Sequence, residues 1–106
     1  MRARVRVDDR HLDVDGTVAF GVFAALAESA ASMGTGVGVA PATVASGMSN
    51  DTTVFASPSS GEMTVEARPR SRSEALWAWD VECHDSAGTQ CALATVLVAV
   101  RPIPAG

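Results

Sequence analysis

One long stretch of the chain is almost entirely apolar, whereas shorter stretches alternate between apolar and polar residues. Residues 17–33 are rich in alanine, and Glu28 is their single ionisable residue. Helix propensity is favourable there, and we predict a helix from about Val18 to Met33. The glycines at 34, 36 and 38 are expected to end it. Because apolar residues cover nearly all of its sides, the helix is expected inside the fold, wrapped by other elements.

Five other segments read as strands, from alternating or continuous apolar runs. Turn clusters at 57–61 and 85–88 separate some of them. The order is then a strand, the helix and four antiparallel strands in a meander, which predicts a single α+β domain over 1–106 with its sheet curled around the helix. The edges and exposed face of such a sheet predict a symmetric dimer. The five segments are 2–7, 42–55, 62–70, 76–83 and 91–100.

Glu28 is the residue that this pattern makes hardest to explain. Burying a carboxylate in an apolar core costs several kcal/mol unless hydrogen bonds compensate it. Two interpretations remain open from the residues. Glu28 has a chemical task, or it is a structural acid bonded to Ser32 or to a backbone N–H group across a dimer.

Composition and charge exclude several classes of function. The formal net charge is -4 at pH 7, the acids are scattered, and basic residues do not interleave with aromatic ones, so no nucleic-acid partner is expected. The N-terminus lacks the apolar run of a signal peptide. The segment 17–33 is short for a membrane span and contains Glu28. A cytoplasmic protein without a membrane segment is therefore expected.

The two cysteines and two histidines do not suggest a metal site. Cys83 and Cys91 flank a predicted hairpin turn, and they are expected to be reduced thiols buried in strands. His11 and His84 have no partners at the spacing of zinc ligands. We expect neither a metal nor a cofactor.

The ordered series of segments resembles the hotdog-fold acyl-CoA thioesterases, most closely the 4-hydroxybenzoyl-CoA thioesterases that use a helix glutamate. The resemblance covers roughly Val5 to Pro102. It implies a hotdog fold, in which a curved antiparallel sheet of about five strands wraps one long central helix. The segments that carry it are Gly21–Glu28, Ser49–Thr52, Gly61 with Val65–Ala67, Trp77–Val81, Cys91–Ala92 and Val98–Pro102.

The resemblance implies a catalytic role for several residues. Glu28 would act as nucleophile or general base on a thioester, and Ser32, one helical turn later on the same face, would hold the attacking water. The backbone N–H of Phe20 or Gly21 would polarise the thioester carbonyl at the helix start. Asp13, in the loop before the helix, would complete the site.

The resemblance also implies where a substrate binds. Phe20 and Phe23 would form part of a hydrophobic acyl pocket, and Asn50, Asp51 and Thr52 would contribute to it from the following strand. The substrate would be an acyl thioester of CoA or of an acyl carrier protein. The active protein would be a dimer or a tetramer with its site between subunits.

Some residues depart from the family pattern. Ala19-Phe20-Gly21 stands where the family has His-Gly-Gly, Ala56 stands where an arginine is usual, and Glu74-Ala75 replaces small hydroxyl residues that contact CoA. These changes indicate a weaker grip on CoA, and with it a carrier-protein substrate, a different nucleotide pose or lost activity. The alternative is a non-catalytic hotdog protein that binds an acyl ligand or a protein partner. A dehydratase of this fold fits less well, because that chemistry needs a histidine near the helix.

Overall fold

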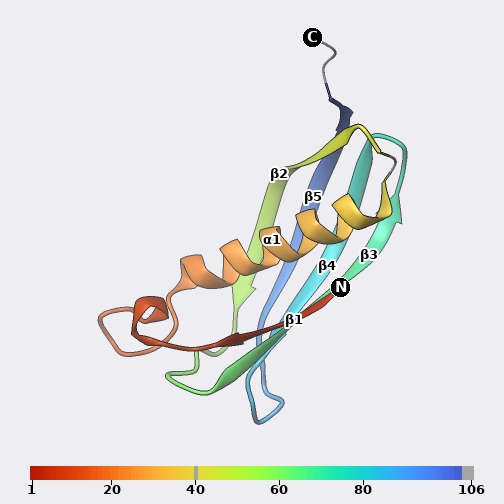
Figure 1. Cartoon of the computed structure of the whole chain (residues 1–106). Coiled ribbons are helices and arrows are strands. Elements are labelled where there is room, and N and C mark those ends of the chain that lie inside the picture. Colours follow the sequence, from red (N-terminus) through yellow and green to blue (C-terminus); the bar gives the residue numbers. More distant parts are fainter. Residues whose placement is uncertain (40, 104–106) are drawn as a thin grey trace.

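A computed structural model of the chain describes residues 1–39 and 41–103 (Figure 1). One long helix lies across a curled sheet of five strands. The α+β architecture expected from the sequence is therefore confirmed. The elements are β1 (Arg2–Arg6), the short 3-10 helix η1 (Asp9–His11), α1 (Phe20–Gly38), β2 (Thr43–Val54), β3 (Glu62–Arg72), β4 (Leu76–His84) and β5 (Gln90–Pro102).

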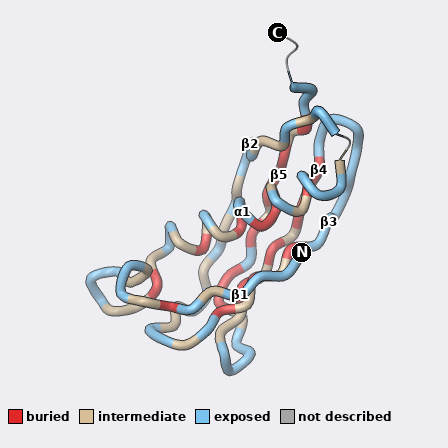
Figure 2. The backbone as a smooth tube through the Cα atoms, in the orientation of Figure 1, coloured by how far each residue is buried: buried red, intermediate tan, exposed pale blue. Residues whose placement is uncertain are grey.

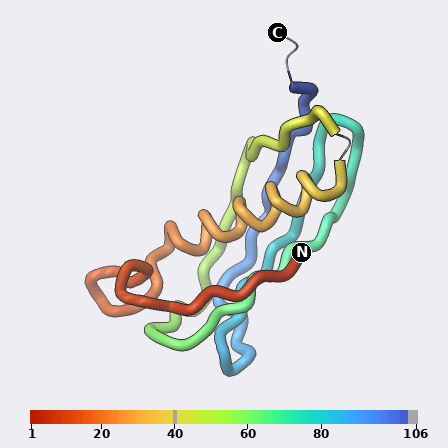
Figure 3. The backbone as a smooth tube through the Cα atoms, in the orientation of Figure 1, coloured from red at the N-terminus to blue at the C-terminus, as the bar shows by residue number. Residues whose placement is uncertain are grey.

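All strand pairs are antiparallel, in the order β1-β3-β4-β5-β2. The predicted meander is correct for β3, β4 and β5 but wrong for β2. That strand pairs with β5, from Thr43 opposite Pro102 to Val54 opposite Ala92, and the loop that follows carries the chain to β3 (Figure 3). In a meander, β5 would be an edge strand. Placing β2 outside it keeps this apolar strand away from the edge.

The helix differs from the prediction at both ends. It begins at Phe20 instead of Val18 and continues through the predicted terminators to Gly38. Two of these glycines are required by packing. A Cβ atom at Gly34 would lie 2.6 Å from Cη2 of Trp79, and one at Gly38 would lie 2.5 Å from Cη2 of Trp77. The glycines allow the helix to pass close over the two indole rings.

Trp77 and Trp79 pack together against the C-terminal part of α1. Their rings are stacked, with centroids 5.9 Å apart. Nε1 of Trp79 donates a hydrogen bond of 2.8 Å to Oγ1 of Thr35, which itself donates one of 2.8 Å to the Ala31 carbonyl. The polar groups of Trp79 and Thr35, both buried, are therefore satisfied. Both tryptophans therefore serve the packing between α1 and the sheet.

The curled sheet covers one face of α1, as predicted, and the other face is exposed in the single chain although it is also rich in apolar residues (Figure 2). The buried face packs on the sheet, mainly near β2. Glu28 is exposed in the single chain, because a sheet curls around a helix from one side only. By length and composition alone α1 could cross a membrane, a test that core helices also pass. The buried face consists of Phe23, Ala27, Ala30, Ala31 and Thr35.

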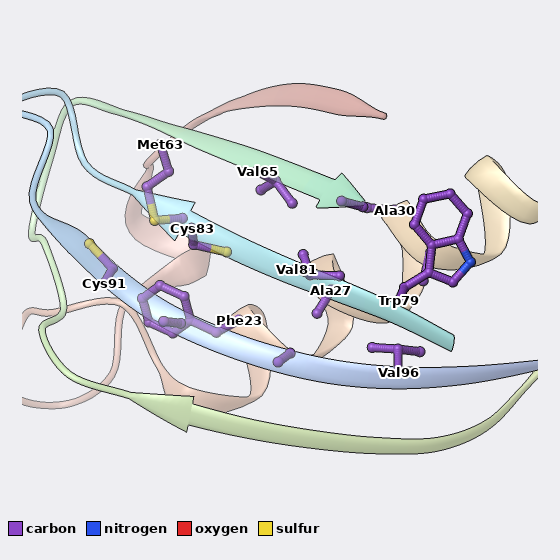
Figure 4. Packing of buried hydrophobic residues seen from close by; sticks show 14 of the residues in the cluster. Phe23, Ala27, Ala30, Met63, Val65, Trp79, Val81, Cys83, Cys91 and Val96 are labelled. Carbon is purple, nitrogen blue, oxygen red and sulfur yellow. The ribbon is translucent and has the colours of Figure 1, made fainter. Parts of the chain in front are cut away.

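The core lies between α1 and the inner face of the sheet (Figure 4). Met63 and Val65 of β3, Val81 of β4 and Val96 of β5 are nearly or completely buried there, and alternate residues of each strand point inward. Phe23 fills the space between the helix and the strands.

Cys83 and Cys91 lie in this core as free thiols. Burial raises the pKa of Cys83 to about 11 and also raises the pKa of Cys91 above its usual range. Because the thiolate is the reactive form, we expect neither cysteine to react with a thiol reagent at pH 8 in the native protein. Both should react promptly in denaturant. Equal rates in the two conditions would contradict the buried placement.

Candidate active site

A hollow of about 420 Å³ opens between the first half of α1 and the edge strand β2. The helix contributes one wall and two polar side chains of β2 contribute the other. The site is therefore built where the sheet leaves the helix uncovered. Its lining residues are Phe20, Ala24, Ala25, Glu28, Ser29, Asn50 and Thr52.

The carboxylate of Glu28 lies directly over the backbone of β2. A Cβ atom at Gly47 would be 2.8 Å from Cδ of Glu28 and 3.0 Å from its Oε2. The β2–β5 register is interrupted between Gly47 and Ser49, so that Met48 is an extra, bulged residue at this point. The absence of a side chain at Gly47 thus provides the space that the carboxylate occupies.

Asn50 connects the two walls of the hollow. Its Nδ2 donates a hydrogen bond of 2.8 Å to the Ala24 carbonyl, and its Oδ1 accepts one of 2.6 Å from Oγ1 of Thr52. In an α-helix the carbonyl oxygen of residue 24 also accepts a hydrogen bond from the N–H of residue 28. The amide of Asn50 therefore bonds to the second lone pair of the Ala24 carbonyl oxygen. These bonds fix the position of β2 relative to the turn of α1 that carries Glu28.

The start of α1 presents free backbone donors beside the hollow. Ala19 precedes the helix without a side-chain cap. The N–H groups of Phe20 and Gly21, at the first helical positions, have no intrahelical acceptor, and the positive end of the helix dipole lies there. The ring of Phe20 is 58% exposed. An anionic or polarised oxygen would be stabilised at this end.

The structure gathers four of the predicted site residues in the hollow: Phe20, Glu28, Asn50 and Thr52. Gly21 is nearby at the helix start and is exposed. Asp51 does not line the hollow. It lies between Asn50 and Thr52 on β2, and successive residues of a strand face opposite sides, so its side chain lies on the outer face of the sheet.

Two other predicted residues of α1 do not line the hollow. Phe23, expected in the acyl pocket, is fully buried in the core, because it lies on the sheet-facing side of α1. Ser32 is half-buried, one turn beyond Glu28, and does not reach the lining.

The two acids of the loop before α1 accept hydrogen bonds from neighbouring residues of the same loop. Oδ1 of Asp13 accepts a hydrogen bond of 2.8 Å from the Val14 N–H. Oδ1 of Asp15 accepts from the hydroxyl and the N–H of Thr17, which hold the pKa of that carboxyl below its usual range. Neither acid lines the hollow with Glu28.

Two contributors were not predicted from the sequence, namely Ser29 and Gly47. Ser29 follows Glu28 and lies on the exposed side of the helix. Gly47 had a usable signal, because a glycine inside a strand often marks a bulge or the close approach of another group. Together the residues offer a carboxylate, two hydroxyls, an oriented amide and two free backbone donors around one hollow.

We expect Gly47→Ala to disturb the position of the Glu28 carboxylate with little loss of stability. The new methyl group would meet the end of an exposed, flexible side chain, which moves aside at low cost. If the carboxylate takes part in a reaction, moving it by about 1 Å should lower the rate of that reaction on the order of 10²-fold. Comparing reaction rates and thermal unfolding of wild type and variant tests this.

Gly36→Ala is the matched control, because a Cβ there meets no atom of the described residues within 4 Å. If Gly47→Ala reacts as fast as wild type, the carboxylate is not used in the position it has over β2.

The chain matches no family model. Its structure is similar to that of a thioesterase from Haemophilus influenzae, with a TM-score of 0.93 and 20% identity over 98% of this chain and 73% of the other. A mutant thioesterase from Pseudomonas aeruginosa has a TM-score of 0.92 and 25% identity over 95% and 73%. A Bacillus halodurans protein whose crystal structure contains CoA has a TM-score of 0.90 and 12% identity over 94% and 66%. In structure, this chain is therefore a hotdog-fold protein similar to solved thioesterases.

Proposed function

We propose that the protein hydrolyses acyl thioesters, with Glu28 as nucleophile or general base. The observation that carries the proposal is the exposed Glu28 carboxylate in a hollow beside the start of α1, on a fold shared with thioesterases. The resemblance of its sequence segments to the 4-hydroxybenzoyl-CoA thioesterases with a helix glutamate supports the proposal.

The chemistry needs few groups. With Glu28 as base, a water molecule loses a proton to the carboxylate while its oxygen attacks the thioester carbon. The carbonyl oxygen gains negative charge next to the N–H groups of Phe20 and Gly21. The C–S bond then breaks, releasing a carboxylic acid and a thiol. A thiolate is a good leaving group, so one carboxylate suffices. With Glu28 as nucleophile, its carboxylate attacks the thioester carbon, and the C–S bond breaks with release of the thiolate to give an anhydride. Water then cleaves the anhydride, which restores the Glu28 carboxylate and releases the acid.

The proposed site is shared between two copies of the chain. The hollow lies beside the edge strand β2, and several large apolar side chains of β2 and α1 are exposed, among them Met48, Val44 and Val37. An unpaired edge and an exposed apolar helix face are typical of a symmetric interface. A dimer would close the hollow and exclude water from it, and two dimers would form a tetramer.

The carrier of the acyl group is CoA or an acyl carrier protein. Both present the same thioester to the hollow. The alanine at position 56, where the family has an arginine, favours the carrier protein. The proposal is tested by measuring the release of free thiol from aryl- and fatty-acyl-CoA thioesters and from the corresponding acyl-carrier-protein thioesters. Hydrolysis of either kind supports it, and inactivity on both overturns it.

A second function is favoured by one observation. The exposed ring of Phe20 lines the hollow at the position where the family has glycine, and it occupies space that an acyl group would need. A hotdog protein that binds an acyl ligand or a protein partner without hydrolysis would tolerate it. Phe20→Gly distinguishes the two functions: it should speed thioester hydrolysis in an enzyme and weaken ligand binding in a binding protein.

A further inference from the structure

A second, smaller groove lies on the opposite flank of α1, between the helix and β1. Its volume is about 180 Å³. We propose that this groove binds the aliphatic chain of a linear acyl substrate whose thioester carbon lies next to Glu28. This inference rests on the proposed function and assigns its substrate class. The side chains that carry the argument are Met1, Ala3, Val5, Leu26, Ala30 and Met33.

The groove exists because α1 lies off-centre on the sheet. The helix packs mainly against β2 and leaves β1 largely uncovered. Ala3 and Val5 pair with Val65 and Met63, which are buried core residues, so they face the same inner side of the sheet. Ala3 is nevertheless exposed and Val5 only half-buried. An apolar strip of the inner face therefore remains available beside the helix.

The groove and the candidate active site are separated by a single ridge of α1. Ser29 lines both the hollow and the groove, and Glu28 is the residue before it. The ridge of α1 between the two spaces carries only the small side chains of Ala25 and Ser29 at its crossing. A chain attached to a carbonyl beside Glu28 passes over this ridge and enters the groove.

The shape and chemistry of the groove select a linear alkyl chain. Residues 26–33 of the helix span about 10 Å and residues 1–5 span about 13 Å, so the groove is long. At about 30 Å³ for a water-sized group, its volume corresponds to about six methylene-sized groups. The described residues that line it include no charged side chain, which disfavours charged or strongly polar tails. An aryl group, being short and broad, would leave much of it empty.

Its two methionines suit this role. Met1 is 41% exposed and Met33 is 63% exposed. Methionine side chains are flexible and polarisable, and they adapt their shape to apolar ligands. They can therefore close over a chain that lies along the groove.

The four methionines of the protein provide a direct test by NMR of ¹³C-labelled methionine methyl groups. Decanoic acid, the product of a linear thioester, is titrated into the protein. The Met1 and Met33 methyl signals should shift. The signal of Met63, buried in the core, should remain in place. Shifts of Met48 without shifts of Met1 and Met33 would overturn the inference.

A variant that fills the groove gives the second test. Ala3→Phe places a ring in the groove from the edge of the sheet, and Arg4→Phe places the same ring on the opposite face of β1. Ala3→Phe should abolish the Met33 shift and lower the ratio of decanoyl- to butyryl-thioester hydrolysis by about tenfold or more, at roughly fourfold per lost methylene contact. Arg4→Phe should leave both unchanged.

The outcomes separate the two proposals. Decanoate binding at Met1 and Met33 in a protein that hydrolyses no thioester supports the groove and overturns the proposed function. Hydrolysis whose chain-length preference is the same in Ala3→Phe and wild type supports the function and overturns the groove. Met1 and Met33 signals that move with protein concentration, without ligand, show that a second copy covers the groove and also overturn it.

Discussion

Glu28→Gln should lower the rate of thiol release by about 10²- to 10⁴-fold, the usual contribution of a general base. Glutamine has nearly the same shape, but its amide can neither accept the proton of an attacking water nor attack a thioester. Because Glu28 is exposed in the single chain, the free energy of unfolding should hardly change. Steady-state kinetics with a chromogenic thiol reagent measures the loss, and the buried thiols of Cys83 and Cys91 contribute little background.

Glu74→Gln is the matched control for this experiment. Glu74 is exposed between β3 and β4 and does not line the hollow, so its replacement removes the same charge without touching the site. Its activity should equal that of the wild type. If Glu28→Gln is as active as Glu74→Gln, Glu28 is not the catalytic group. If it alters stability or ligand affinity alone, the non-catalytic binding protein is the better description.

The strands were predictable because their signal is local. Alternation with a period of two is visible in the sequence, and every predicted strand corresponds to an observed one with bounds within a few residues. The position of β2 was not predictable in this way. Alternation shows which side chains face inward but says nothing about which strand is the neighbour, and the pairing of β2 with β5 is decided by burial across the whole sheet.

Most residues of the candidate site could be predicted from the sequence, but their burial and their contacts with other elements could not. Phe20, Glu28, Asn50 and Thr52 do lie around one hollow. The expected burial of Glu28 was wrong for the single chain, because an apolar helix can expose its small residues on one side. The space for the Glu28 carboxylate at Gly47, and the position of Ser29 between the hollow and the groove, depend on contacts between elements. A local sequence pattern does not show such contacts.

The end of α1 provides the clearest case of a local signal overruled by packing. Three glycines within five residues usually end a helix, but Gly34 and Gly38 are needed for contact with Trp79 and Trp77. The tryptophans are far away in the sequence. Local sequence therefore gives the wrong helix end, and the contacts across the core give the right one.

Gly34→Ala and Gly36→Ala should change stability in opposite directions, although they lie two residues apart in one helix. Alanine favours a helix over glycine by about 1 kcal/mol. At Gly36 a Cβ has no neighbour within 4 Å in the part of the chain that the structure describes, so Gly36→Ala should stabilise the protein by about 0.5–1 kcal/mol. At Gly34 the Cβ would lie 2.6 Å from Cη2 of Trp79. Overpacking of this kind costs about 1–3 kcal/mol, which exceeds the gain in propensity.

The ring of Trp79 has little freedom to relieve this clash. It stacks on Trp77, and its Nε1 donates a hydrogen bond to Thr35 on the same helix. Moving the ring would break that bond and leave a buried donor without a partner, at a further cost of about 1–3 kcal/mol. Denaturant unfolding of the two variants measures the difference, and tryptophan fluorescence reports the ring. Equal stabilisation by both substitutions would show that Trp79 yields freely, and that Gly34 is present for a reason other than packing.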